Sequence, residues 1–253
     1  MGIGYSLGCL VSILLWSFER ERLFCTLDRF INKFIGNKAI RYTITAALIG
    51  IILFIFIRIK GEYMNFIAAF LVIDLSHSER ENIDAMEIKF HKTIAIACRA
   101  LVCGFTAPLL YLVLLGNYGA LIYFLLYNLC SLQDYKFLHP ILRVLTIIPG
   151  IIAQGVLYLI YLVQGRGRAE IDFKGDYFTN IWERPLLNVE ITAACLEDVS
   201  FFYFFSREDK SYMKSYGSEK KLLDEDNIQH YIGTLYLASF MIFLFFIGIY
   251  III

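Results

Sequence analysis

The sequence lacks the short motifs that carry nucleotide, acyl-transfer or metal chemistry. It contains no P-loop, no G-x-G-x-x-G, no H-E-x-x-H, no G-x-S-x-G and no zinc-finger spacing. Its six cysteines show no C-x-x-C spacing and fall mostly in apolar runs, where a free cysteine acts as a small hydrophobic residue. Its four histidines are scattered and share no face. We therefore expect no metal site and no cofactor.

The chain also lacks net charge, since 23 basic residues balance 23 acidic ones. This balance argues against a nucleic-acid partner. Polar residues are scarce: the chain is 58% apolar and 16% aromatic, and its mean hydropathy is +0.63. Soluble domains lie nearer 45–50% apolar. The composition predicts an all-α, polytopic transmembrane helical bundle forming one membrane domain over residues 1–253, with the lipid bilayer as its main partner.

Several apolar segments approach the length of about 20 residues that a membrane-spanning helix needs. Basic residues follow the first segment and none precedes it, so the positive-inside rule places Met1 outside and residues 19–41 inside. Residues 63–75 are too short for a simple span and form either a short tilted helix or a surface segment. The expected spans are residues 2–18, 42–57, 95–115, 120–136, 141–163 and 231–253.

Residues 19–41 show the spacing of an amphipathic helix. Their apolar residues recur at steps of three and four, while the basic residues fall off that face. The helix lies either in the cytoplasmic membrane interface or against the protein's own cytoplasmic part. The apolar residues of this face are Leu23, Leu27, Phe30, Ile31 and Phe34.

A charge-free run of 33 residues, from Ala100 to Leu132, is too long for one span. As a single helix it would measure about 50 Å, against a hydrocarbon core of about 30 Å. The sequence Gly116–Gly119 has the composition of a turn. We expect either a helical hairpin or a span followed by a re-entrant half-helix, with Pro108 in its first arm.

Residues 164–230 form a polar loop between the last two spans. Pro185 marks the first turn of a helix that we expect to run through the aromatic residues as far as Phe205, followed by a solvated loop. Glu190 and Glu197 share one face of this helix at a spacing of seven residues. A solvated face is the favoured reading, and Glu190 is kept as a binding candidate.

Charged and kinked positions within apolar segments are further candidates for binding or structural roles. Arg99 and Arg143 are costly at depth in a membrane and therefore mark either a functional site or side chains that reach the headgroups. Pro149 lies inside the span 141–163, where the carbonyl it frees must find an internal partner.

Polar residues in and after the 33-residue run complete the candidate set. Asn117 and Asn128 are expected to form hydrogen bonds across helices. Asp134 is expected to form an ion pair with Lys136 in the loop at the membrane surface.

The helices over residues 95–163 carry a resemblance to known membrane proteins. Ala107-Pro108-Leu109 is followed by an apolar run, a glycine turn, a second helix and a later helix with an internal proline at Pro149. This order resembles the superfamily shared by AmpE and the cobalamin-biosynthesis CobD/CbiB proteins. The segment "ERERLFCTLDRFI" after the first span looks more like AmpE.

The polar motifs of the CobD/CbiB proteins are largely missing. Where that family has E-N-x-x-D-G, this chain has Arg99 through Gly104, which keeps only the glycine. Asn128 alone remains of a K-x-x-N-T-L-D-S run, and Leu142-Arg143 stands near the place of paired aspartates. A synthetase that uses ATP and Mg²⁺ depends on such groups, so the resemblance favours AmpE.

Three hypotheses follow. The first is an AmpE-like inner-membrane protein without enzymatic activity, with a signalling or accessory role of the kind associated with β-lactamase regulation or cell-wall sensing, contacting a membrane or cytoplasmic protein partner. The second is a divergent adenosylcobinamide-phosphate synthase of the CobD/CbiB type. The third is a small transporter or channel subunit, based on the broken hairpin and Arg99.

Overall fold

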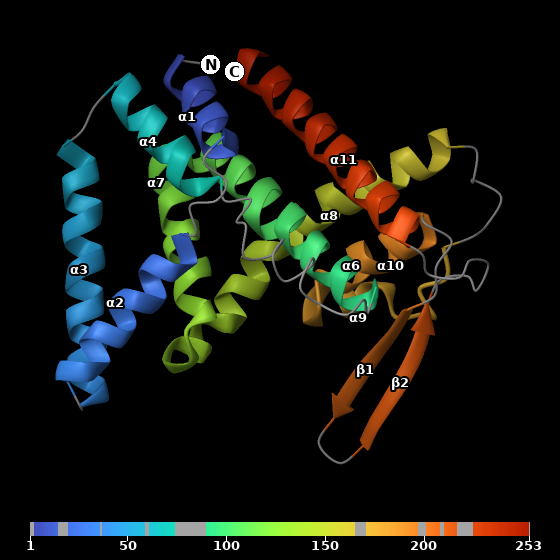
Figure 1. Cartoon of the computed structure of the whole chain (residues 1–253), viewed down its shortest axis with the longest axis horizontal. Coiled ribbons are helices and arrows are strands. Elements are labelled where there is room, and N and C mark those ends of the chain that lie inside the picture. Colours follow the sequence, from blue (N-terminus) through green and yellow to red (C-terminus); the bar gives the residue numbers. More distant parts are fainter. Residues whose placement is uncertain are drawn as a thin grey trace.

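The structure, a computed structural model, is mostly helical and carries one antiparallel hairpin (Figure 1). It describes residues 3–14, 20–35, 37–58, 61–73, 90–164, 171–196, 201–207, 210–216 and 225–252. The elements are α1 (Ile3–Leu14), α2 (Arg20–Phe34), α3 (Lys38–Arg58), α4 (Glu62–Val72), α6 (Phe90–Arg99), a π-helical turn (Ala100–Thr106), α7 (Ala107–Ser131), a 3-10 helix (Gln133–Leu138), α8 (His139–Val163), α9 (Tyr177–Glu183), α10 (Leu187–Leu196), β1 (Phe201–Arg207), β2 (Lys210–Tyr216) and α11 (Glu225–Ile252).

The structure confirms the expected helical class in its coarse form. The prediction for residues 164–230 is wrong in part, because this segment is not simply one helix and a polar loop. Its described part contains α9, α10 and the β1–β2 hairpin, in which Phe201 pairs with Tyr216 and Arg207 with Lys210. The helix expected to reach Phe205 ends at Leu196. Consecutive aromatic residues lose side-chain freedom in a helix and fit a pleated strand, which accounts for the change.

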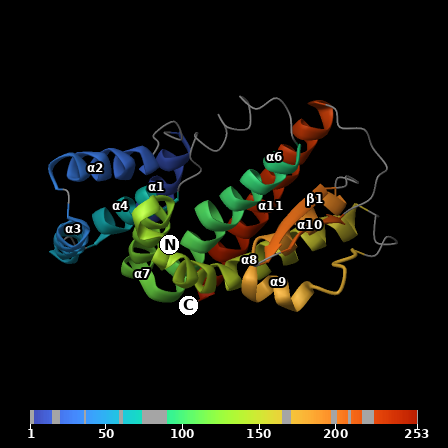
Figure 2. The same ribbon diagram turned by 90° about the horizontal axis from the view of Figure 1, so that it is seen from below.

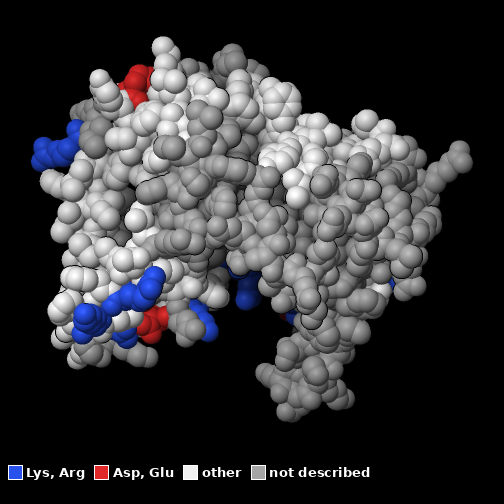
Figure 3. Space-filling model, viewed as in Figure 1, with Lys and Arg blue, Asp and Glu red and all other residues white. Residues whose placement is uncertain are grey.

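Three helical segments of the described chain are long and apolar enough to cross a membrane: Ile94–Ser131, Asp134–Val163 and Ile232–Ile249. Ile40–Phe56 in α3 is apolar but shorter. In the space-filling view, charged side chains lie along the lower edge over α2 and the start of α3, and at the upper left where α3 ends and α4 begins (Figure 3). The described surface between these two charged zones is almost uncharged.

The apolar run breaks at Gly116, as the sequence predicts. Gly116 has φ 68° and ψ −164°, a conformation that glycine adopts without steric cost, and it divides α7 into two arms. In Figure 1 the chain runs upward through α6, the π-helical turn and the first arm of α7, and runs back downward through the second arm. The segment is therefore a helical hairpin.

The carbonyl that Pro149 frees inside α8 has an internal partner. Proline at 149 cannot donate to the Leu145 carbonyl four residues earlier. The Tyr111 hydroxyl, from the first arm of α7, donates to this carbonyl at 2.6 Å. The expectation that the freed carbonyl is satisfied within the protein is thus confirmed, and the hydrogen bond ties α7 to α8.

A second proline–tyrosine pair lies at the π-helical turn. The Ala107 amide donates to the Val102 carbonyl, and in this register Pro108 would face the Cys103 carbonyl but has no N–H to offer. The Tyr123 hydroxyl, from the second arm, donates to the Cys103 carbonyl at 3.3 Å. The Tyr111 and Tyr123 rings stack with centroids 5.1 Å apart, so the two bonds share one buried aromatic layer.

Helices α1 and α4 run parallel and in close contact. A Cβ atom on Gly4 would lie 2.2 Å from the Glu62 carbonyl oxygen, and one on Gly8 would lie 2.5 Å from that of Phe66. Glu62 also accepts a hydrogen bond from the Gly4 amide at 2.7 Å. Small residues four apart allow such an approach. The described part of the segment 63–75 is therefore a short helix, α4, that packs along α1.

Helix α2 leaves most of its apolar face uncovered. Leu23, Leu27, Phe30 and Phe34 are exposed, and only Ile31 of this face is buried. The alternative in which this face packs on the protein's own polar part is therefore wrong for these four side chains. On its other side, α2 contacts α3 through a hydrogen bond from Arg41 to Asn32.

Seen from below, the helices form a broad layer. The group α1–α4 lies at one side, α9, α10 and the hairpin lie at the other, and α6, α7, α8 and α11 lie between them (Figure 2). The start of α1 and the end of α11 come close together in both ribbon views.

Candidate functional site

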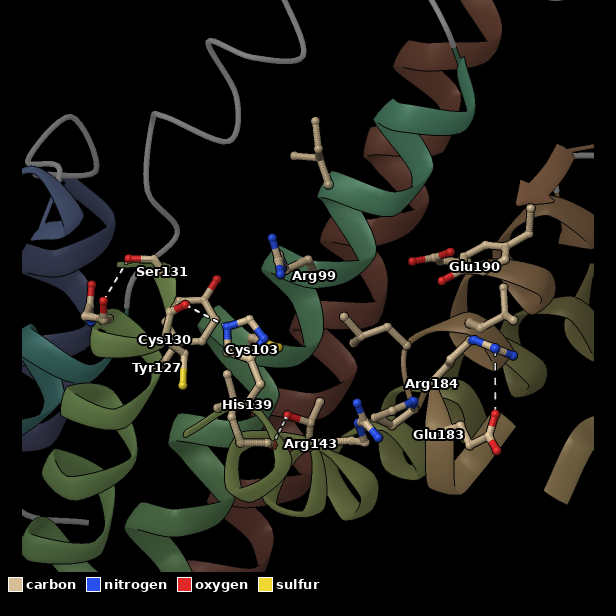
Figure 4. A pocket seen from close by; sticks show the side chains of 18 residues that line it. Arg99, Cys103, Tyr127, Cys130, Ser131, His139, Arg143, Glu183, Arg184 and Glu190 are labelled. Atoms are coloured by element: carbon tan, nitrogen blue, oxygen red, sulfur yellow. Dashed lines mark hydrogen bonds and ion pairs between the residues drawn. The ribbon is translucent and has the colours of Figure 1, made fainter. Parts of the chain in front are cut away.

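A cavity of about 670 Å³ lies between α6, the end of α7, the start of α8, α10 and β1 (Figure 4). Its lining includes three arginines, Arg99, Arg143 and Arg184, and two carboxylates, Glu183 and Glu190. Its volume falls in the range of small-molecule sites. We call it the arginine pocket.

The helical hairpin brings Arg99 to this pocket. Arg99 lies 17 residues before Gly116 and Ser131 lies 15 residues after it, so the two arms return the chain to nearly the same level. Helix α8 begins at the same end with His139, and Arg143 follows one turn later on the same face. Both residues line the pocket beside Arg99.

The opposite wall is held against α8 by close backbone contact. A Cβ atom on Gly150 would lie 3.1 Å from the Pro185 carbonyl oxygen. This contact fixes the segment that carries Glu183 and Arg184 and leads into α10. The Arg184 guanidinium lies 3.6 Å from Glu183 and 5.9 Å from the centre of the Tyr203 ring.

Glu190 is buried, which corrects the solvated face favoured from sequence. Its exposed fraction is 8%, and its carboxylate points across the pocket toward Arg99 (Figure 4). Burial raises its pKa to about 7, and the nearby positive charge of Arg99 opposes that rise. Helix α10 contacts α6, α8 and α9, so Glu190 lies between packed helices and borders the pocket rather than an open surface. Glu197 lies outside the described residues.

Two other polar groups of the pocket interact with their neighbours. The His139 Nε2 atom lies 2.9 Å from the Cys130 carbonyl. Burial raises the pKa of Tyr203, the Glu190 charge adds to this rise, and Arg184 opposes it. Tyr203 of β1 thus interacts electrostatically with both Glu190 and Arg184.

Four of the sequence candidates meet in this pocket: Arg99, Asn128, Arg143 and Glu190. The hydrogen bond described for Asn128 goes to the Phe124 carbonyl of its own helix at 2.8 Å, so the expected bond across helices is corrected. The helix-spanning role falls to Asn117, which accepts from Tyr5 and donates to Asn65, both at 2.8 Å.

The remaining candidates lie outside the pocket and support the fold. Asp134 pairs with Arg41 of α3 at 2.8 Å, so the ion pair expected with Lys136 is wrong. Arg41 is the better partner because α3 brings its guanidinium to a partly buried position beside the loop. Pro108 and Pro149 belong to the two proline–tyrosine pairs.

Sequence reasoning missed Arg184, His139 and Tyr203 as pocket residues. The available signal was the charged pair Glu183-Arg184 directly before the proline that starts a helix. Nothing local indicated that this pair would face Arg99, because the two segments meet only through the packing of α10 on α6 and α8.

The donor set favours anions over metal ions. Among the described residues, no group of three or more His, Cys, Asp or Glu side chains is arranged to hold a metal. Three guanidinium groups offer planar, paired N–H donors of the kind that bind phosphate, sulfate and carboxylate. The arrangement suits recognition of a small anion.

In comparisons with known proteins, no family model, no curated protein and no solved structure matches this chain.

Proposed function

We propose that this chain is a multi-pass inner-membrane protein that binds a small anionic ligand in the arginine pocket, in a sensing or accessory role. The observation that carries the proposal is the meeting of Arg99, Arg143 and Arg184 in one cavity at the end of two long apolar helices. Such helices supply the membrane anchor, and clustered guanidinium groups supply affinity for an anion.

The side of the membrane on which the pocket opens is inferred from the basic residues that follow α1. Arg41 of this basic segment pairs with Asp134, in the loop between α7 and α8 that also leads to His139 of the pocket. By the positive-inside rule, the segment is cytoplasmic. The pocket would then open at the cytoplasmic end of the helices, where it could respond to a soluble anion.

The AmpE-like interpretation is compatible with this proposal. The resemblance implies a membrane protein of signalling or accessory type, whose cytoplasmic elements contact a protein partner. The exposed face of α2 is available for such contacts. The β1–β2 hairpin extends away from the helices (Figure 1).

A binding measurement tests the proposal. The purified chain in lipid nanodiscs is titrated with inorganic sulfate by calorimetry. We expect binding that Arg143→Gln weakens by about tenfold or more, because a charge-assisted contact contributes about 1.5–3 kcal/mol. Arg58→Gln is the matched control, since Arg58 is exposed at the far end of α3. Absence of sulfate binding, or equal weakening by both variants, would overturn the proposal.

A divergent synthase of the CobD/CbiB type is the second candidate, because the same arginines suit a phosphate-bearing substrate. A growth test distinguishes the two. The gene is introduced into a strain that lacks the cobalamin enzyme, with Arg143→Gln as the comparison. Growth restored by the unmodified gene alone would favour the synthase, and absence of growth with a folded protein would favour the sensing role.

A further inference from the structure

The arginine pocket contains an acid in an unusual place. Glu190 projects from α10, a helix whose described side chains are almost all buried, and no hydrogen bond is described for its carboxylate. A buried carboxylate without a hydrogen-bonding partner is costly in its charged form. The positive charge of Arg99, across the cavity, favours the charged carboxylate.

An anion in the pocket would change this balance. The anion adds negative charge close to Glu190 and draws the positive charge of Arg99 toward itself. Both effects disfavour the carboxylate relative to the neutral acid. Since a neutral Glu190 can also donate a hydrogen bond to the anion, the protonated state favours the occupied pocket.

We propose that the pocket binds its anion together with a proton, which Glu190 takes up. This inference rests on the proposed anion-binding function and adds a proton linkage to it. The linkage is reciprocal: if the anion favours protonation of Glu190, then protonation favours the anion to the same degree. The site would thereby report the anion and the pH together.

The neighbours of Glu190 include other groups that respond to pH or carry charge. His139 also lines the pocket and carries a ring that can bind a proton, so it is the main competing explanation for any pH dependence. Strand β2 also contacts α10, and its charged residue Lys214 forms an ion pair with Asp176. The charged or titratable groups that line the cavity from the surrounding elements are Arg99, Cys103, Tyr127, Cys130, His139, Arg143, Glu183, Arg184 and Tyr203.

The position of Glu190 on the pH scale makes the linkage measurable. Because its pKa is about 7, the Glu190 carboxyl group is partly deprotonated near neutral pH when no anion is bound. Affinity should therefore fall as pH rises through this value, because above it the anion must meet a charged carboxylate or carry in a proton. Sulfate is a suitable probe because it keeps its double negative charge throughout this range.

The experiment measures sulfate affinity in nanodiscs at several pH values, with proton uptake taken from calorimetry in buffers of different ionisation enthalpy. For the unmodified chain we expect up to about tenfold weaker binding at about pH 8 than at about pH 6.5. Each bound sulfate should bring a fraction of one proton. Glu190→Gln should bind sulfate with the low-pH affinity at every pH and take up no proton.

Two further variants make the result decisive. His139→Gln should keep the pH dependence, and Asp172→Asn, at an exposed acid outside the pocket, should match the unmodified chain. Binding that depends on Arg143 but is independent of pH would overturn the proton linkage and leave the anion site standing. So would a pH dependence that persists in Glu190→Gln and disappears in His139→Gln. Absence of sulfate binding at every pH would overturn both proposals.

Discussion

At the scale of single residues, the most informative side chains are Tyr111 and Tyr123. The Tyr111 hydroxyl donates to the Leu145 carbonyl, whose α-helical donor would be residue 149, a proline. The Tyr123 hydroxyl donates to the Cys103 carbonyl, which Pro108 faces in the π-helical register. In a protein interior, and still more in a membrane, such a carbonyl is expensive to leave unsatisfied. The prolines thus need not weaken their helices, because the tyrosines replace the missing donors and join neighbouring segments.

This account predicts a specific coupling between Tyr111 and Pro149. Tyr111→Phe should lower the free energy of unfolding by about 1–2 kcal/mol, because the Leu145 carbonyl loses its donor. In the background of Pro149→Ala, which restores a backbone N–H, the same change should cost much less. Thermal unfolding in detergent gives the four values of this double-mutant cycle.

Tyr158→Phe serves as the control for this cycle, since Tyr158 is exposed on α8. Its hydroxyl has no described role in satisfying a carbonyl, so this change should leave stability nearly unaffected. Equal costs of Tyr111→Phe with and without Pro149 would show that the hydroxyl does not compensate for the proline.

At the scale of helices and strands, sequence reasoning succeeded where the chain carries strong local signals. The break at Gly116 and the amphipathic pattern of α2 were both visible as residue types at fixed spacing. The β1 strand was missed because its apolar run was read as a continued helix. The burial of Glu190 was missed because it depends on the packing of α10 against α6 and α8, and α6 is remote along the chain.

The α1–α4 pair gives a prediction at this scale. Gly8→Ala should lower the free energy of unfolding by about 1–3 kcal/mol, because the new Cβ atom would meet the Phe66 carbonyl at 2.5 Å. Gly50→Ala in α3 is the matched control, since nothing lies within 4 Å of its added Cβ atom. That change should be neutral or slightly stabilising. Chemical or thermal unfolding of both variants decides the comparison.

At the scale of the whole molecule, two clusters of polar side chains lie at opposite ends of the second arm of α7. Asn117 joins the hairpin turn to Tyr5 and Asn65 at one end. Arg41 and Asp134 join α3 to the α7–α8 loop at the other. The arm of α7 between them is about 22 Å long, counted from Asn117 to Ser131. The proposed membrane would separate the two clusters.

Cysteine labelling tests this arrangement in a background with Cys25→Ser and Cys195→Ser, the two cysteines that are only partly buried. A membrane-impermeant thiol reagent should label Tyr63→Cys in intact cells and Lys136→Cys only after lysis. Both positions are exposed. Labelling of Lys136→Cys from outside intact cells would invert the proposed topology.

The number of residues in the first arm of the helical hairpin determines which side chains line the arginine pocket. Arg99 reaches the cavity because its arm has a fixed number of residues between the turn at Gly116 and the pocket wall. One residue added to that arm would turn Arg99 by about 100° around the helix and shift it by about 1.5 Å. Substitutions along the arms change packing, whereas insertions change which side chains the pocket contains. Natural variation in this segment should therefore alter residue types far more readily than residue number.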